Sequence, residues 1–495
     1  MIVRISDLIN QLKGVVGNRY VITSPYSMER FCSGYRSGSG KAMAVVCPKT
    51  LLEQWRVLEF CVAADVIVIM QAANTGLTEG STPSGIYDRG VVVLSTNRMS
   101  KIKLIKNGEQ IIAFPGATLY SLEEKLKPLN RQPHSVIGSS CVGASIIGGV
   151  CNNSGGALIE RGPSYTELSL TAKVNQNGVL ELTNHLGINL GNDPETILTR
   201  LEAGDFNDND FEEGDFIASD KEYQNRVRDI ESETPARFNA DPTRLYEASG
   251  CAGKLSVFAV RVDTYPRNER EKTFYIGVQN PSVLTDMRRD MLSSFSILPV
   301  SAEYMHKECY DISKKFGKDT LILIDKLGTE KLPKLLSIKS WLDARLNRSN
   351  WFPANFTDKI MLAIGTIWPN VLPKRMEEFR NRFDHHLILK MRDDGIDEAR
   401  LYIKDKFNGV DSDFFECDNR EAEIASLHRF VAAGAAVRYM AINSGTVADI
   451  VALDIALKRN EQNWFEKLRL ALIRQSATNF IMDIFFVTFS IRIIS

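Results

Sequence analysis

Residues 66–81 have the sequence VIVIMQAANTGLTEGS, and the fold that we predict for the N-terminal half of the chain follows from this stretch. It opens with a β-branched apolar run, which predicts a buried strand, and continues as a loop of small residues. An apolar run at 42–47 and an amphipathic stretch at 51–65, with Thr50 as its N-cap, come directly before it. We therefore predict a strand, a helix and a second strand that leads straight into the loop.

The small residues of the loop at 71–81 allow its backbone to approach a ligand closely. Successive backbone amides in such a turn form a nest for an anion such as a diphosphate, and Thr75 and Ser81 can add hydroxyl donors. A second small-residue stretch, at 138–156, provides another backbone wall, so that the two could grip an extended dinucleotide. Neither stretch is a G-x-G-x-x-G turn opening a helix, and no G-x-x-x-x-G-K-[ST] loop occurs, which disfavours a Rossmann or P-loop site.

The bulk properties indicate a folded protein of more than one domain. A length of 495 residues predicts two or three domains, and 44% hydrophobic residues is an ordinary content. A net charge of -1 gives no global field that would recruit nucleic acid or a membrane. Eight scattered cysteines without a CxxC pair favour reduced thiols over a disulfide framework or a metal site. We also find no apolar run of the length that a transmembrane helix needs.

Two segments differ from this average. Residues 202–222 are acidic, and their irregular spacing predicts a solvated surface insertion without a metal. Residues 326–382 hold eleven Lys and Arg against five Asp and Glu, a net charge of +6, together with three tryptophans. Basic and aromatic side chains together are typical of a surface that lies against a membrane. A nucleic-acid interpretation of this segment has no motif to support it.

A dense set of motifs resembles one protein family. The strand and loop at 66–81, HSVIGSSCVGASIIGGVCNNSGG at 134–156 and GCAGKLSVFAV at 250–260 resemble the flavin-binding domain of the vanillyl-alcohol-oxidase (PCMH) type. With RGPSYTE at 161–167 and LHRFVAAGAAVRY at 427–439, the chain is most similar to the bacterial respiratory, quinone-dependent D-lactate dehydrogenases. The resemblance runs from about residue 5 to 467 and implies an α+β fold.

The resemblance also implies noncovalent FAD. Its diphosphate would lie on the first loop, and the second stretch and one later strand would complete the site. The residues implied are Ala72, Ala73, Asn74, Thr75, Gly76, Gly80, Ser81, Gly138, Ser145, Gly155 and Val257.

In the family that the chain resembles, a base takes the hydroxyl proton of a 2-hydroxy acid and the flavin takes the hydride, while a cation holds the carboxylate. His385 and His386 begin an alternating run that predicts a strand, on which one of the two would face a core or cleft. His428 and Arg429 precede a small-residue helix that contains Arg438. We expect the substrate pocket among these five residues, although a structural role suits any single histidine as well.

The resemblance divides the chain into domains and implies partners. We expect an FAD-binding domain at 1–268 with its core at about 38–208, a cap domain at 269–467, and a membrane-contact segment at 326–382. The implied partners are D-lactate, a membrane quinone and an anionic phospholipid surface, without nucleic acid. The implied location is peripheral, on the cytoplasmic face of the inner membrane.

The end of the chain, 468–495, departs from the family pattern. Relatives continue with histidine-rich elements such as H-K-x-Y-Y-G-H-F, and a one-base shift in the codons for 477–486 can restore a similar segment. We therefore hypothesise a frameshift after residue 467, which the coding DNA would test. Two alternative functions stay open: oxidation of another 2-hydroxy acid, such as glycolate or 2-hydroxyglutarate, and an inactive remnant that still binds FAD. An NAD-linked dehydrogenase is disfavoured because the Rossmann pattern is absent.

Overall fold

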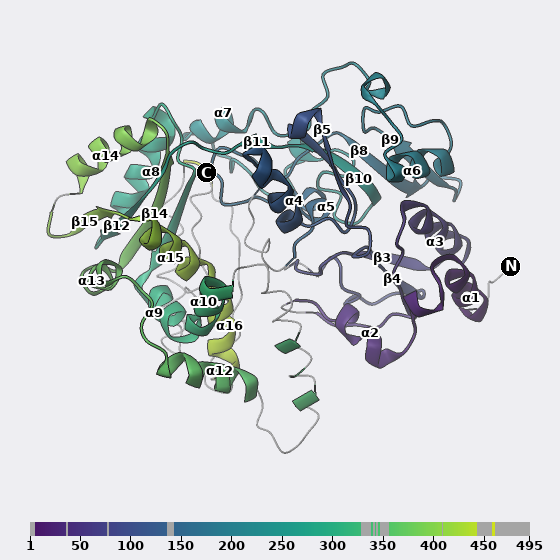
Figure 1. Ribbon diagram of the computed structural model, residues 1–495, viewed down its shortest axis with the longest axis horizontal. Coiled ribbons are helices and arrows are strands. Elements are labelled where there is room, and N and C mark those ends of the chain that lie inside the picture. Colours follow the sequence, from purple (N-terminus) through teal and green to yellow (C-terminus); the bar gives the residue numbers. More distant parts are fainter. Residues whose placement is uncertain are drawn as a thin grey trace. The chain divides into compact units, whose positions relative to one another are not determined.

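The computed structural model describes residues 5–35, 38–76, 79–135, 143–327, 338–339, 342, 345–346, 356–407, 409–442 and 458–460 (Figure 1). The chain forms two compact units, which we describe separately. Unit 1 comprises Met1–Gly156, Gly162–Lys221 and Asn239–Arg267. Unit 2 comprises Ala157–Arg161, Glu222–Phe238 and Asn268–Ser495. The tail at 468–495, with the proposed frameshift, lies outside the described residues.

Unit 1 contains two main sheets and a two-stranded ribbon. Its strands are β1 (Val21–Ile22), β2 (Ala44–Val46), β3 (Ile67–Gln71), β4 (Val91–Ser95), β5 (Ile102–Ile105), β6 (Gln110–Ala113), β7 (Arg131–Gln132), β8 (Ser169–Val174), β9 (Leu180–Asn184), β10 (Ser256–Asp263) and β11 (Tyr265–Pro266). Its α-helices are α1 (Ile5–Val16), α2 (Pro25–Cys32), α3 (Leu51–Ala63), α4 (Leu119–Leu126), α5 (Ile146–Cys151) and α6 (Pro194–Ala203).

The predicted strand, helix and strand are β2, α3 and β3 of the first sheet. Its order is β1-β2-β4-β3, and β2 and β3 both pair in parallel with β4. The predicted N-cap is confirmed, because Thr50 Oγ1 accepts a hydrogen bond from the Glu53 amide at 3.1 Å. The prediction of a buried strand before the loop is wrong: β3 is only half-buried, since it lies at the sheet edge, whereas β4 is fully buried.

The second sheet of unit 1 is antiparallel, with the order β5-β6-β10-β8-β9. One of its faces contributes to the core that also contains α1, α3 and the first sheet. Its other face packs on α4 and α5. The helix α5 starts within the second small-residue stretch, so unit 1 brings both stretches of the predicted flavin site into one body.

Unit 2 is built on a four-stranded antiparallel sheet with the order β13-β14-β12-β15. Its strands are β12 (Glu271–Val278), β13 (Ser301–His306), β14 (His385–Arg392) and β15 (Ser412–Glu416). Its helices include α7 (Tyr223–Arg228), α8 (Ser282–Ser294), α9 (Lys307–Phe316), α10 (Lys318–Leu327), α12 (Phe356–Ile367), α13 (Lys374–Arg382), α14 (Gly395–Lys406), α15 (Asn419–Phe430) and α16 (Ala432–Ile442).

Helices cover both faces of this sheet. On one face, α8 and α14 pack on alternate residues of β12 and β14 and form a hydrophobic core. On the other face, aromatic contacts join the strands to α9, α13 and α15, and Figure 1 shows these helices on the side opposite α8 and α14. The mixture of helices and largely antiparallel sheets confirms the α+β class. Among the described residues, no helix is both long and apolar enough to cross a membrane.

Candidate functional site

The first loop of the predicted flavin site follows β3 directly, as expected. Asn74 has a left-handed backbone with φ 53°, a conformation that Asn tolerates better than most residues. Its side-chain nitrogen donates to the Ser33 carbonyl at 2.8 Å. Its side-chain oxygen accepts hydrogen bonds from the hydroxyls of Ser81, at 2.7 Å, and Thr82, at 3.2 Å. The Asn74 and Ser81 side chains therefore hold the loop closed on itself.

The loop backbone is available to a ligand. Among the described residues, the amides of 73–76, which follow one another around the left-handed residue Asn74, donate no hydrogen bond. A Cβ added at Gly76 would meet nothing within 4 Å, so the loop is open on that side. Unpaired amides in such a turn attract an anion. This geometry fits a diphosphate held by backbone amides, with Asn74 and Ser81 shaping the turn.

Gln71, which was not predicted from the sequence, anchors this loop to the end of β3. It is buried at the end of β3, and its side-chain nitrogen donates to the carbonyls of Phe31 at 2.8 Å and Ser81 at 2.6 Å. One amide group therefore ties the end of α2 and the far end of the loop to the strand. A polar residue that closes an apolar run was the only signal of it in the sequence.

We expect Gln71→Leu to weaken FAD binding about 10- to 100-fold. The change leaves two carbonyl acceptors without their donor, each at a cost of about 1–3 kcal/mol in stability. Part of this loss destabilises the loop that binds the diphosphate. Fluorescence titration of the apoprotein with FAD measures the effect. Gln132→Leu is the matched control, because that amide makes its bond to the Pro266 carbonyl at the surface. Equal FAD affinities for the two variants would show that Gln71 does not contribute to the FAD site.

The second wall lies close to the first. A Cβ added at Gly143, where φ is 96°, would be 3.8 Å from the Ala73 side chain, so Gly143 leaves a space of about one methyl group between itself and Ala73. Ser145 is the N-cap of α5, and its hydroxyl accepts from the Gly148 amide at 3.0 Å. Gly155 forms an isolated bridge with Pro163. Gly138 lies outside the described residues.

Val257 is buried in β10, beside a bulge of the second sheet. Its carbonyl accepts a weak bond from the Gln54 side chain at 3.4 Å. Thr75 is half-buried and Gly80 exposed in the first loop, in keeping with an accessible cradle. The structure thus places the described members of the predicted set in unit 1.

The predicted catalytic histidines occupy unit 2. β14 begins at His385, as predicted, but both His385 and His386 are buried, because helices cover each face of the sheet. His385 Nδ1 lies 2.7 Å from the Tyr304 hydroxyl, and its ring meets that of His306 edge to face at 5.2 Å between centroids. His306, which the sequence analysis did not select, pairs with His385 across β13 and β14.

A carboxylate acts on this pair. Asp384 forms an ion pair with Lys307 at 3.0 Å, and its pKa is lowered by that bond first and, more weakly, by His306 and His385. The His306–His385 pair therefore has an orienting hydroxyl and a nearby negative charge, the two features that a histidine base requires.

His386 and His428 lie on the opposite face. Their rings contact Tyr310, at 5.9 Å and 4.4 Å between centroids. Burial lowers the pKa of each to about 3, and for His386 the neighbouring histidines lower it further. Both imidazoles are neutral at physiological pH and suit a packing role more than proton transfer.

These two histidines give unit 2 an acid-sensitive core. The unfolded chain takes up protons below a pKa of about 6.5, while the folded chain does not until about 3, so the free energy of unfolding falls as pH falls through that window. We expect a loss of about 2 kcal/mol per histidine between pH 7 and 5, measured by urea unfolding. His386→Phe and His428→Phe should each remove about half of the pH dependence. An unchanged slope in the double variant would contradict this account.

The two predicted arginines have different surroundings. Arg429 is half-buried in the last turn of α15, near enough to Cys309 to act on that thiol's pKa. Arg438 is buried and engaged: it forms ion pairs with Asp319 and, at 3.1 Å, with Asp358, and it donates to the Phe316 carbonyl at 2.8 Å. These bonds join α10, α12 and the end of α9 to α16, so Arg438 has a structural task that leaves little of its guanidinium for a substrate.

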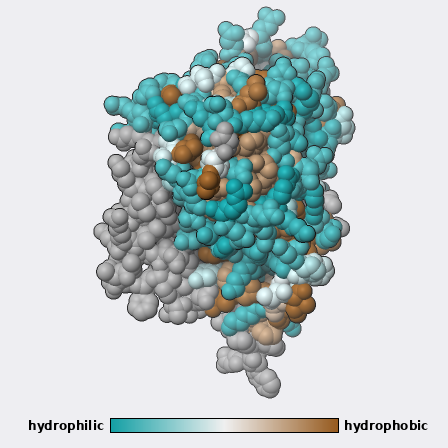
Figure 2. All heavy atoms as spheres, turned by 90° about the vertical axis from the view of Figure 1, so that its left-hand side faces the viewer, coloured by the Kyte–Doolittle hydropathy of each residue, from teal (hydrophilic) through white to brown (hydrophobic). Residues whose placement is uncertain are grey.

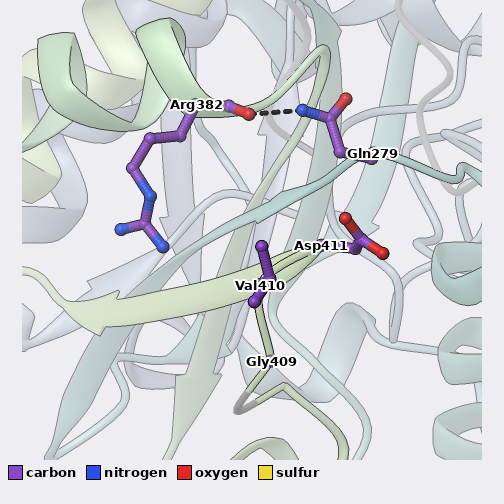
Figure 3. Close-up of a pocket in the computed structure, with 5 residues that line it drawn as sticks. All are labelled: Gln279, Arg382, Gly409, Val410 and Asp411. Carbon is purple, nitrogen blue, oxygen red and sulfur yellow. Dashed lines mark hydrogen bonds between the residues drawn. The ribbon is translucent and has the colours of Figure 1, made fainter.

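A cavity of about 610 Å³ in unit 2 has none of these residues in its lining. It is lined by Gln279, Arg382, Gly409, Val410 and Asp411, and Figure 3 shows the Gln279 side chain directed at the Arg382 carbonyl. The Arg382 guanidinium is bonded to Asp413 at 2.7 Å. None of the predicted site residues lines this cavity, and it offers neither a histidine nor an anion nest.

Comparison with known proteins identifies relatives that match most of the chain. It is 54% identical over 461 residues to the "Quinone-dependent D-lactate dehydrogenase" of Escherichia coli (strain K12), covering 93% of this chain and 81% of that protein. The enzyme of the same name from Haemophilus influenzae is 52% identical and has 83% of its length covered.

The chain belongs to the quinone-dependent D-lactate dehydrogenase family.

Two family models match within this D-lactate dehydrogenase sequence. Residues 42–168 match "FAD binding domain", and residues 273–489 match "D-lactate dehydrogenase, membrane binding". The first range contains both walls of the cradle, and the prediction of FAD is confirmed. The crystal structure of p-cresol methylhydroxylase with substrate bound superposes with a TM-score of 0.51 at 11% identity, over 86% of this chain and 71% of that one. That likeness confirms the PCMH-type fold of the family.

Proposed function

We propose that this chain oxidises D-lactate to pyruvate with noncovalent FAD and passes the electrons to a membrane quinone. The observation that carries the proposal is the turn of unpaired amides at 73–76, which faces Gly143 inside a range that matches an FAD-binding domain. Two relatives that are named for this activity are more than half identical to the chain. We assign the FAD-binding domain to 1–268 and the cap to 269–467.

The protein residues have distinct tasks in this reaction. FAD, when bound, supplies the acceptor for the hydride. His385 is proposed to take the hydroxyl proton, because the Tyr304 hydroxyl orients its ring and the next residue along the chain is the carboxylate Asp384. Arg429 is the remaining predicted cation for the carboxylate, since Arg438 is occupied by Asp319 and Asp358. His386 and His428 pack the opposite face of the sheet.

Anaerobic flavin bleaching tests the function. The purified chain should hold FAD, lose its visible absorbance on addition of D-lactate, and regain it with a soluble quinone analogue. L-Lactate should leave the spectrum unchanged. Faster bleaching by glycolate or D-2-hydroxyglutarate would assign another substrate of the same class. Bound FAD that stays oxidised with every 2-hydroxy acid would indicate the inactive alternative. Folded protein that purifies without flavin would contradict the assignment of the FAD site to this loop.

We further propose that unit 2 attaches peripherally to the cytoplasmic face of the inner membrane and favours anionic phospholipid. Within 326–382, the exposed apolar side chains in the described part of the chain are Leu327, Ile338, Leu342, Ile360, Ile367 and Trp368. Figure 2 shows hydrophobic atoms gathered toward the bottom of one face, at the level where Figure 1 draws α12. Trp341, Trp351 and Phe352 lie outside the described residues.

The charge of the segment is partly neutralised. Lys339, Arg375, Arg380 and Arg382 form ion pairs with Asp358, Glu421, Asp311 and Asp413. These cations contribute less to lipid attraction than the net charge of +6 suggests. Insertion of apolar side chains should therefore supply much of the binding, with the remaining lysines selecting anionic lipid at about 1 kcal/mol each.

Ile367→Asp should lower the partition of the protein onto anionic vesicles about tenfold. Ile367 is 87% exposed beside Trp368, which is 47% exposed, and a carboxylate there opposes both insertion and the lipid charge. Sedimentation with phosphatidylglycerol vesicles measures the loss. Val410→Asp is the matched control, because Val410 is 92% exposed in the same unit but lies outside the segment. A similar loss in both variants would show a general charge effect and contradict the assigned surface.

A further inference from the structure

Two cysteines that are distant in sequence meet in unit 1. Cys151 is the last residue of α5, and Cys251 lies in the turn before β10. Two backbone hydrogen bonds join their segments: the Gly250 amide donates to the Val150 carbonyl at 3.0 Å, and the Ala252 amide to the Cys151 carbonyl at 2.9 Å. Both side chains belong to one packed cluster, and the two thiols are close enough to share a hydrogen bond. Both are free thiols in this structure.

The turn around Cys251 has an unusual backbone conformation. Its neighbours Gly250, Ala252 and Gly253 have φ values of 70°, 49° and 87°, and a left-handed alanine persists only where the surroundings enforce it. The backbone amides of Gly253 and Leu255, which follow Cys251 in this segment, lower the pKa of its thiol, since amide groups near a sulfur favour its negative charge.

The electrostatics agree with the geometry. The Cys151 thiol and, to a lesser degree, the amides lower the pKa of Cys251 to about 6, against the opposing effect of burial. Buried thiols elsewhere in the chain behave in the opposite way. Burial raises the pKa of Cys61 to about 12 and that of Cys309 to about 11. Cys251 is therefore set apart as a nucleophile, since the thiolate is the reactive form.

We propose that Cys251 and Cys151 form a peroxide-reactive dithiol, with Cys251 as the attacking thiolate and Cys151 as the resolving thiol. The Cys251 thiolate attacks one oxygen of hydrogen peroxide, so that an S–O bond forms, the O–O bond breaks, and the sulfur is oxidised by two electrons to the sulfenic acid. The other oxygen leaves as hydroxide, which takes up a proton and becomes water. The Cys151 sulfur then attacks the sulfenic sulfur, a disulfide forms, and a second water leaves. A thiol reductant reverses the change.

The place of the pair gives the reaction a consequence. Cys151 directly precedes residues 152–155 of the second wall of the flavin cradle, and Cys251 leads into the strand that carries Val257. A disulfide would tie this wall to that strand. Oxidation should thus change how firmly the cradle is held, without a change in any residue that contacts the ligand.

Peptide mapping of the holoprotein tests the proposal. After a few equivalents of hydrogen peroxide, the nonreduced digest should contain a peptide that joins Cys151 to Cys251, about 2 Da lighter than its two parts and lost on reduction. Cys151→Ser should instead accumulate a sulfenic acid at Cys251 that dimedone traps. Cys61→Ser, which removes another buried thiol of the same unit, should form the disulfide as the unmodified chain does.

A second measurement needs no variant. Brief alkylation of the native chain by iodoacetamide at pH 7 should label Cys251 before Cys61, Cys309 and Cys417, although Cys251 is only 7% exposed. The Cys251 labelling rate should fall as the pH is lowered through about 6. Labelling of Cys251 no faster than that of Cys61, or peroxide treatment that leaves the Cys151–Cys251 peptide absent, would overturn the proposal. Neither readout depends on D-lactate turnover.

Discussion

Replacing His385 by asparagine is expected to slow the reduction of bound FAD by D-lactate about 10²- to 10⁴-fold. Asparagine retains a polar group beside the Tyr304 hydroxyl, which lies 2.7 Å from His385 Nδ1, but it cannot accept the substrate proton. Stopped-flow absorbance under anaerobic conditions measures the step directly.

The neighbouring residue supplies the control. His386→Asn alters the next position of the same strand but faces Tyr275 and Tyr310, where burial keeps the imidazole neutral with a pKa of about 3. We expect its reduction rate to change by only a few-fold. Urea unfolding of both variants separates chemistry from packing, because the His385 variant should lose rate without a matching loss of stability. Equal losses of rate in both variants would exclude His385 as the base.

The second large effect is expected at Arg438. Arg438→Met should lower the free energy of unfolding of unit 2 by about 3–5 kcal/mol, because it leaves the buried Asp319 and the half-buried Asp358 without their cation. Methionine retains much of the side-chain volume, so the loss reports the charge more than a cavity. Urea unfolding followed by tryptophan fluorescence measures the change.

Two comparisons make this result specific. The double variant Arg438→Met with Asp319→Asn removes both charges of the closest pair and should recover part of the loss. Arg89→Ala breaks surface ion pairs with Asp65 and Asp88 and should change the free energy of unfolding very little, because both partners are solvated. If Arg438→Met retained its stability while D-lactate reduction collapsed, the arginine would belong to the substrate site after all.

The parts of the fold that the sequence predicted depend on local rules. The helix at α3 follows from its amphipathic spacing and its threonine cap, and the flavin loop follows from a run of small residues that includes Asn74, whose φ is 53°. The start of β14 at His385 was visible as an alternating run. Each of these signals lies within about fifteen residues of the feature that it specifies.

The parts that the sequence did not predict depend on contacts between distant segments. β3 is half-buried because it falls at a sheet edge, which no property of its own residues reveals. Gln71 acts on a carbonyl forty residues away, and His306 is joined to His385 only by strand pairing. Arg438 stood beside a conspicuous small-residue run, yet its partners come from two other helices.

The covering of both faces of the β14 sheet has a consequence for mutational tolerance. Alternate residues of β14 face opposite sides of the sheet. His385, Leu387 and Leu389 face the side that α8 and α14 cover, and His386 faces the side of α9, α13 and α15. Deleting one residue just before the strand would exchange the two sets and turn Lys390, now paired with Glu271, toward the apolar layer. The strand therefore admits a single alignment with its neighbours. Losing one codon here would do more harm than most amino-acid exchanges in the same segment.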